Sequence, residues 1–170
     1  MPPRERYCPH LIPPSALTRR DFSCLVPTAK LVGDTTYRRT TAGFIYLTVA
    51  HDLCTRMVVG WSIRDNMRAG LVVFALKMAY SRGYVAGGAI FHSDRGSQYT
   101  SSEFAACSAA HDVRLSVGRT ESCHDNALAE SFFATLKNEW YYHKRLLDAS
   151  TTKHKAHEFN RVVLQPLPPA

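Results

Sequence analysis

The chain has 170 residues, 45% of them hydrophobic, a length and composition that fit one soluble globular domain with a buried core. Its longest apolar run, near Leu71 to Ala79, is too short to cross a bilayer, and no apolar signal segment follows the arginine-bearing N-terminus, so we expect no membrane partner and a cytoplasmic location. The five cysteines form no CxxC pair, which argues against a disulfide framework or a zinc site.

The net charge of +7 is concentrated at the two ends of the sequence. Residues 1–40 have an excess of four positive charges, residues 41–130 are balanced, and residues 131–170 have an excess of three. Basic flanks around a neutral centre suit a polyanionic ligand such as DNA, because Lys and Arg neutralise phosphates and release counterions. A solvated positive surface would give the same totals, so charge alone leaves both interpretations open.

The first half of the sequence predicts a leader followed by strands. Residues 1–25 are rich in proline and show no clear hydrophobic period, so they are predicted to be a poorly ordered leader. Three segments rich in β-branched and aromatic residues follow, with short polar breaks between them, and predict a meander of three strands. These segments are 30–38, 43–51 and 56–64.

The next segments alternate between helix and strand. Apolar residues at helical spacing over 68–82 predict a buried helix that ends at Gly83, and a short apolar run over 89–94 predicts a buried strand. Ser101 or Ser102 is a candidate N-cap for the next helix. The remaining predicted elements are a helix over 101–111, a strand over 114–118, and helices over 125–144 and 148–163. This order predicts an α/β fold, a five-stranded mixed sheet flanked by helices.

Three acidic residues form a candidate metal site. Asp34 falls inside the first predicted strand, Asp94 ends the fourth, where ligands of α/β sheets collect, and Glu130 lies in the long helix. Mg²⁺ is usually held by one or two carboxylates plus phosphate oxygens, so three carboxylates can hold two ions. Two ions about 3.5 to 4 Å apart can activate the attacking oxygen and stabilise the leaving oxygen of a phosphoryl transfer. Each acid taken alone could instead simply face water.

Further polar residues flank the three acids. Asn126 and Lys137 lie about 40° and 20° from Glu130 on a helical wheel, so one helix face could reach an ion and a DNA phosphate together. An ordinary amphipathic helix explains the same spacing. Arg95 begins the polar loop after the second acid and is a further candidate DNA contact. His92 projects to the same side as that acid, and we interpret it as a neighbour of the site, because imidazole is not the usual ligand of magnesium.

The motifs GDTTY (33–37), HSDRGSQYTSSEF (92–104) and DNALAESFFATLK (125–137) resemble the catalytic core of bacterial insertion-sequence transposases of the retroviral-integrase-like DDE group, which adopt a ribonuclease H-like fold. The resemblance implies that Asp34, Asp94 and Glu130 bind two Mg²⁺ or Mn²⁺ ions and that Lys137 contacts DNA at the element end. Water and then a DNA 3′-hydroxyl would attack phosphodiester bonds. The motifs match the family over about residues 21–147, and we assign an integrase-type catalytic core to 26–163 and a disordered tail to 164–170.

The sequence departs from the family pattern at Leu31, Arg38 and His124, where the family usually has Trp, an apolar residue and Trp. The pattern of the last helix breaks after Arg161, and the usual N-terminal helix-turn-helix has no counterpart. We therefore interpret the chain as truncated at both ends, and we expect a separate helix-turn-helix subunit and a second copy of the chain as partners besides DNA.

Two functional hypotheses result from the sequence. The first is a catalytic core that carries out metal-dependent DNA cleavage and strand transfer, in DNA integration, transposition and recombination. The second is a catalytically inactive remnant that binds DNA or a full-length partner. A nuclease that cleaves without joining is a third interpretation, because it would use the same three acids.

Overall fold

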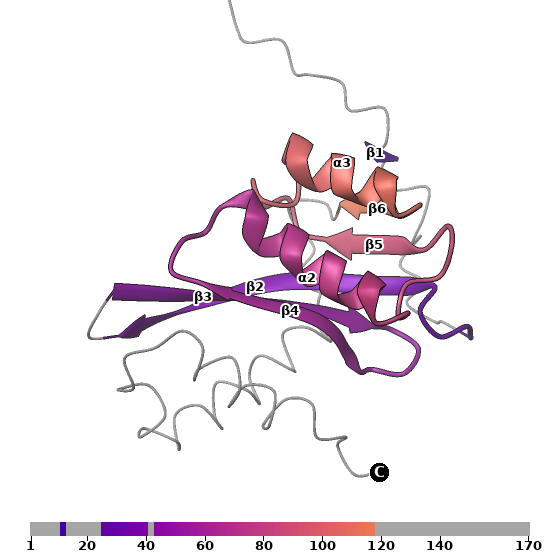
Figure 1. Ribbon diagram of the computed structural model, residues 1–170, viewed down its shortest axis with the longest axis horizontal. Helices are drawn as coiled ribbons and strands as arrows, with labels where there is room; N and C mark the ends of the chain where they lie inside the picture. Colours follow the sequence, from indigo (N-terminus) through magenta and orange to yellow (C-terminus); the bar gives the residue numbers. More distant parts are fainter. Residues whose placement is uncertain (1–10, 13–24, 41–42, 118–170) are drawn as a thin grey trace, which may run out of the picture.

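A computed structural model describes residues 11–12, 25–40 and 43–117, and these form one sheet with two helices (Figure 1). The predicted helices beyond Val117, with Asn126, Glu130 and Lys137, lie outside the described residues, as do most of the leader and the tail. The described elements are β1 (Leu11–Ile12), β2 (Lys30–Thr40), β3 (Gly43–Asp52), β4 (Val58–Arg64), α2 (Ala69–Ser81), β5 (Ile90–Ser93), α3 (Ser102–Ala110) and β6 (Arg114–Val117).

The six described strands form one mixed sheet in the order β1-β6-β5-β2-β3-β4. β2, β3 and β4 are the antiparallel meander that the sequence predicts, and β5 and β6 join β2 in parallel. The five predicted strands are therefore confirmed. β1 is an additional short strand that pairs in parallel with β6, and it lies in the segment that was expected to be a poorly ordered leader.

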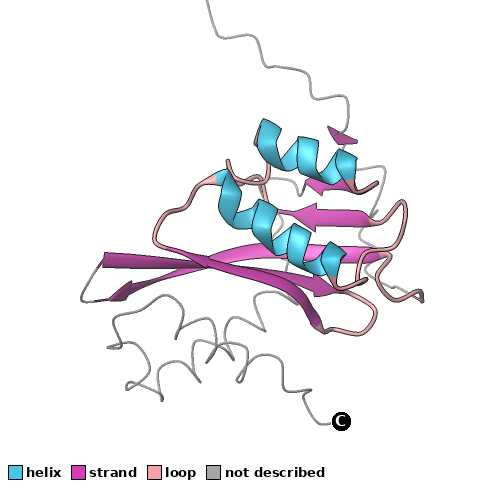
Figure 2. Cartoon of the chain, viewed as in Figure 1, coloured by secondary structure: helices cyan, strands magenta, loops and turns pink. Residues whose placement is uncertain are grey.

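The two helices cover one face of the sheet and enclose the main core (Figure 2). Most apolar residues of α2 are buried against the sheet, although Phe74 is exposed, and α3 packs beside α2. Gly60 on β4 is needed for this packing, because a Cβ at that position would overlap the carbonyl oxygen of Ala75. The absence of a side chain at Gly60 therefore allows α2 to lie close to β4.

The start of α3, the end of α2 and the two described thiols agree with the sequence expectations. Ser101 caps α3, since its hydroxyl accepts the N–H of Phe104 at 3.2 Å. α2 ends at Ser81, and the chain then turns through Gly83, whose positive φ of 77° suits glycine. Cys54 and Cys107 are free thiols. In the described ranges, neither helix has the length and apolar character needed to span a membrane.

Candidate active site

Asp34 and Asp94 lie next to each other at one edge of the sheet because of the register of β2 and β5. These two strands run in parallel, and Gly33 is the register partner of Ser93. Each aspartate directly follows this pair, so Asp34, inside β2, lies beside Asp94, which is the first residue beyond the end of β5. Parallel strands present ligands at this carboxyl edge in α/β folds. The structure thus brings together two acids that are sixty residues apart in the sequence.

Asp34 is held in place by its own strand. Its side chain has intermediate exposure, and its Oδ1 accepts the N–H of Thr35 at 2.7 Å. Thr35 points toward the helices, where its hydroxyl contacts Thr48 and Tyr99. Because successive side chains of a strand point to opposite faces, Asp34 lies on the face away from α2 and α3.

Asp94 is exposed, and the loop that follows it fixes one of its oxygens. Its Oδ1 accepts the N–H of Gly96 at 2.9 Å, and a Cβ on Gly96 would crowd the same oxygen. Gln98 then donates from Nε2 to the carbonyl of Met67 at 3.0 Å, which ties the loop to the connection between β4 and α2. Arg95, the other candidate in this loop, is exposed directly after Asp94.

Tyr99 is buried in the core next to the two aspartates. It is 2% exposed, its ring packs edge-on against Phe104, and its hydroxyl lies 3.2 Å from the Thr35 hydroxyl. Burial raises the pKa of Tyr99, and the charges of Asp34 and Asp94 raise this pKa further. The phenol is therefore neutral at physiological pH.

His92 lies in β5 two residues before Asp94 and is 4% exposed. Its Nδ1 is 3.0 Å from the hydroxyl of Ser116 on β6, so the ring connects two neighbouring strands. Its interpretation as a neighbour of the site, and not a ligand, stays a prediction.

The described part of the chain contributes two of the three predicted metal ligands. It contains no group of three or more His, Cys, Asp or Glu side chains arranged to hold a metal, and Glu130 lies outside it. Two carboxylates at one edge nevertheless fit Mg²⁺, which prefers hard oxygen donors and few protein ligands. The sequence reasoning missed Tyr99, because the polar loop 95–101 around it gives no sign that its ring is buried.

Comparison with known proteins gives a family match. The model of the integrase core domain family matches residues 26–123. The transposase InsF for insertion sequence IS3A of Escherichia coli (strain K12) is 37% identical over 161 residues, 91% of this chain and 56% of that protein. The transposase for insertion sequence element IS904 of Lactococcus lactis is 37% identical over 123 residues, 72% of this chain and 49% of that protein. The chain spans about half the length of these curated relatives.

Solved structures show the same fold at low sequence identity. A chain of the simian T-cell lymphotropic virus intasome, solved with the PP2A regulatory subunit B56 gamma, has a TM-score of 0.72 and 16% identity, and the match covers 86% of this chain and 52% of that one. The catalytic core domain of HTLV-2 integrase in complex with magnesium has a TM-score of 0.61 and 19% identity, with coverage of 80% and 86%. The fold is thus the ribonuclease H-like fold of integrase cores. Because the family match spans more than half of the sequence, the chain belongs to the integrase core domain family, in the group of insertion-sequence transposases and DDE polynucleotidyl transferases.

Proposed function

We propose that this chain is a transposase catalytic core that cleaves DNA and transfers the cut strand to a target. The observation that carries the proposal is the register of β2 and β5, which puts Asp34 on β2 beside Asp94 at the end of β5. Glu130 is the third proposed ligand, and two Mg²⁺ or Mn²⁺ ions are the proposed cofactor. The names of the relatives and the magnesium complex of a structurally similar core support this assignment.

The residues of the chain have separate proposed roles. Asp34 and Asp94 each have one oxygen oriented by a backbone N–H, so their carboxylates are fixed before a ligand binds. When bound, the divalent ions supply Lewis-acid activation of the attacking hydroxyl and stabilisation of the leaving oxygen. Tyr99 stays neutral beneath the site and adds no competing charge.

DNA is the proposed substrate, and contacts to its phosphates are assigned to basic and amide side chains. Arg95 is exposed beside Asp94, where it can reach a phosphate of the strand being cut. Lys137 and Asn126 are proposed to contact the same DNA from the face that bears the third acid. A second copy of the chain and a separate helix-turn-helix subunit are the proposed protein partners.

The test is nicking and joining of a labelled DNA duplex by the purified chain in Mn²⁺ or Mg²⁺. Glu130→Gln removes one metal carboxylate with little change in volume, so we expect it to abolish both products. Asp112→Asn makes the same kind of change at an exposed carboxylate at the opposite edge of the sheet and serves as the matched control. Equal nicking by the parent and Glu130→Gln would refute the three-acid site.

The products separate the proposal from the two other hypotheses. Cut and joined strands support a transposase core, whereas cut strands alone support a nuclease. A folded parent that binds DNA and gives neither product supports the inactive remnant.

A further inference from the structure

The outer part of the β2–β3 hairpin carries three clustered aromatic rings. Figure 1 shows β2 and β3 extending past the N-terminal end of α2. On this extension the centroid of the Tyr37 ring lies 5.8 Å from that of Phe44 and 6.2 Å from that of Tyr46. Tyr37 is 63% exposed and Phe44 is 47% exposed, although aromatic rings of this size normally bury most of their surface. The cluster therefore presents ring surface to solvent.

Two arginines lie on the same face of the sheet as the rings. Tyr46 is the register partner of both Tyr37 and Arg64, and Phe44 is the register partner of Arg39. Residues opposite each other in register point to the same face. This is also the face of Thr35, which contacts Tyr99, so it is the face covered by α2 and α3 further along the sheet.

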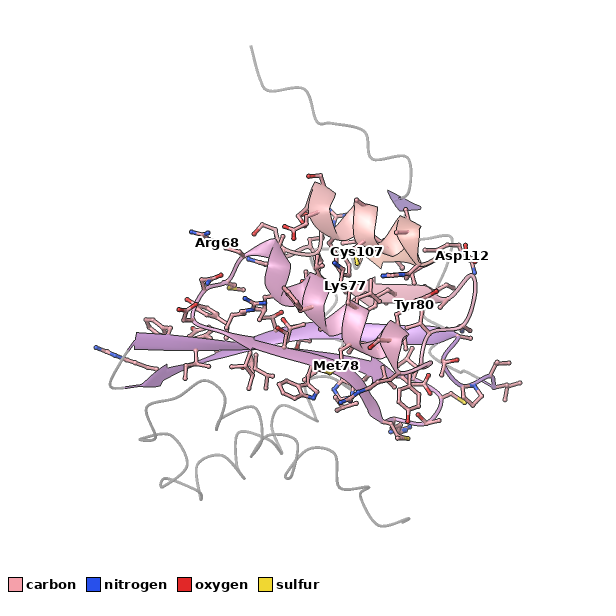
Figure 3. The ribbon with its side chains drawn as sticks, in the orientation of Figure 1. Arg68, Lys77, Met78, Tyr80, Cys107 and Asp112 are labelled. Atoms are coloured by element: carbon pink, nitrogen blue, oxygen red, sulfur yellow. The ribbon has the colours of Figure 1, made fainter. Side chains whose placement is uncertain are left out.

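Arg64 connects the hairpin rings to α2. Its guanidinium carbon lies 4.3 Å from the centroid of the Phe74 ring, and Phe74 is 52% exposed on α2. We define the aromatic-basic track as Tyr37, Arg39, Phe44, Tyr46, Arg64 and Phe74. At its α2 end the track opens into a groove of about 600 Å³ between β4 and α2, where Lys77 and Met78 form part of the wall (Figure 3).

We propose that the aromatic-basic track binds unpaired bases of the DNA substrate next to the cleavage site. Exposed aromatic rings stack on nucleobases without regard to sequence, because every base has a π-face, while arginine contacts the phosphates between them. The track combines four rings with two guanidinium groups and includes no carboxylate, so its charge complements a polyanion. Lys77 of α2 is the other basic residue that lines the groove, beside Arg64.

The position of the track fits a role beside the proposed reaction, and the inference rests on the proposed function. Tyr37 follows Asp34 by three residues on the same strand, roughly 10 Å along it, and its ring lies on the opposite face of the sheet. β5 ends at Ser93, so among the described strands β2 has no neighbour on that side beyond Gly33, and a DNA strand bound at the carboxylates reaches the rings by passing round this open side of β2. Bases inside a duplex are stacked on each other and cannot reach the rings, so the track selects DNA that is already unpaired.

The first experiment measures binding of a fluorescein-labelled ten-nucleotide oligothymidylate to the full chain by anisotropy, without divalent metal. Phe44→Leu removes a stacking ring, and we expect the affinity to fall by about fivefold or more, as for the loss of one stacked base. Phe44→Trp keeps a ring and should restore binding. Tyr80→Leu is the matched control, because Tyr80 is 46% exposed on α2 toward the opposite end of the sheet. Equal affinities of the parent, Phe44→Leu and Phe44→Trp would overturn the proposal.

A second experiment maps the contact directly and does not depend on a variant that folds. The same oligonucleotide with 5-iodouracil is irradiated on the parent chain, and the crosslinked peptide is identified by mass spectrometry. Crosslinks within residues 37–46 are expected, and crosslinks found only elsewhere would overturn the proposal. A duplex of the same length should compete poorly, and equal competition would show that the track does not contact bases.

The two proposals fail in distinguishable ways. Asp94→Asn should keep oligothymidylate binding while losing nicking, because the track does not include the carboxylates. If the parent binds oligothymidylate normally but cannot nick DNA, the proposed catalysis is refuted and the proposed role of the aromatic-basic track is retained. If Phe44→Leu nicks DNA and binds oligothymidylate as tightly as the parent, the proposed role of the aromatic-basic track is refuted and the proposed catalysis is retained.

Discussion

The two ends of the sheet carry aspartates with opposite environments. Asp52, at the end of β3, is 1% exposed, and its carboxylate accepts bonds from the N–H groups of Thr28 and Thr55, at 3.1 and 3.2 Å, and from the Thr55 hydroxyl at 2.7 Å. Asp94, beyond the end of β5, is exposed, and its Oδ1 accepts the N–H of Gly96 at 2.9 Å. A buried carboxylate whose oxygens accept hydrogen bonds from its own chain holds loops together. An exposed carboxylate beside a second acid can instead bind a cation.

This comparison shows that a carboxylate's role depends on its donors and not on its residue type. Both aspartates terminate strands, and both are followed by a turn. At Asp52, charged hydrogen bonds offset the cost of burying the carboxylate. At Asp94, exposure avoids that cost and leaves oxygen lone pairs accessible to a ligand. Substitutions at the two positions should therefore affect different properties.

The largest effect is expected for Asp94→Asn on the rate of metal-dependent nicking. The substitution removes one metal-binding charge, and we expect the rate to fall by at least about a hundredfold, which corresponds to roughly 2.7 kcal/mol of transition-state free energy. The free energy of unfolding should stay within about 0.5 kcal/mol of the parent, as for most exposed positions. Asp112→Asn should change neither quantity. A variant that nicks at the parent rate would place Asp94 outside the site.

The opposite pattern is expected for Asp52→Asn. The amide presents hydrogen atoms toward N–H groups that need an acceptor, so at least one buried donor is left unpaired, and we expect a loss of about 3 kcal/mol in the free energy of unfolding. Urea denaturation followed by circular dichroism measures this loss. Nicking per folded molecule should be unchanged. A parent-like unfolding midpoint would mean that the Asp52 bonds do not stabilise the loops at this end.

A pH effect of similar size is expected at the Asp52 end, through the neighbouring residue His51. Burial lowers the pKa of His51 to about 4 from an ordinary value of 6.5, while a hydrogen bond with the backbone of Arg56 raises it. The unfolded chain takes up the proton more readily, so the stability is fully present above pH 6.5 and is lost as the pH falls toward 4. The loss is on the order of 3 kcal/mol.

Urea denaturation at pH 7, 6, 5 and 4.5 measures the contribution of His51 when the parent is compared with His51→Gln. We expect the parent to lose stability over this range more steeply than the variant. Parallel pH profiles of the two proteins would contradict a buried, neutral His51.

The sequence predicted those elements whose evidence is local, and it missed those that depend on distant partners. The apolar period of α2 and the cap of α3 are contained in the segments themselves, and both were confirmed. β1 is only two residues long, and its partner β6 lies more than a hundred residues later, so no local pattern predicts it. Tyr99 is buried because Phe91 and Phe104 surround it, which the polar loop around it does not reveal.

The candidate site was predictable to the same extent. Asp34 and Asp94 were identified from the sequence by their unusual positions, and the order of elements predicted a mixed sheet without saying which strands pair. Their alignment depends on the register of Gly33 with Ser93, which is set by packing across the sheet. The ring cluster of Tyr37, Phe44 and Tyr46 likewise depends on the register of the hairpin, and alternation in one strand does not predict it.

The smallest expected effect tests how the site is joined to the core. Gly33 precedes Asp34, and a Cβ at Gly33 would overlap the buried Phe91 ring and lie 3.1 Å from Tyr99. Phe91 is 1% exposed, so its ring can shift only by displacing its neighbours in the core, and Gly33→Ala should cost about 1 to 3 kcal/mol in the free energy of unfolding. Gly70→Ala is the matched control, because a Cβ there meets no atom within 4 Å. In a helix it should stabilise by about 0.5 to 1 kcal/mol.

Gly33→Ala should also reduce nicking per folded molecule, since displacement of Phe91 and Tyr99 moves the strand that holds Asp34. A shift of about 1 Å at a reacting group is enough to slow catalysis strongly. If Gly33→Ala lost stability while its folded fraction nicked DNA at the parent rate, the carboxylates would be positioned independently of the core beneath them. The aspartates at the two ends of the sheet would then differ in the hydrogen-bond donors around them, but the position of neither would depend on packing in the core.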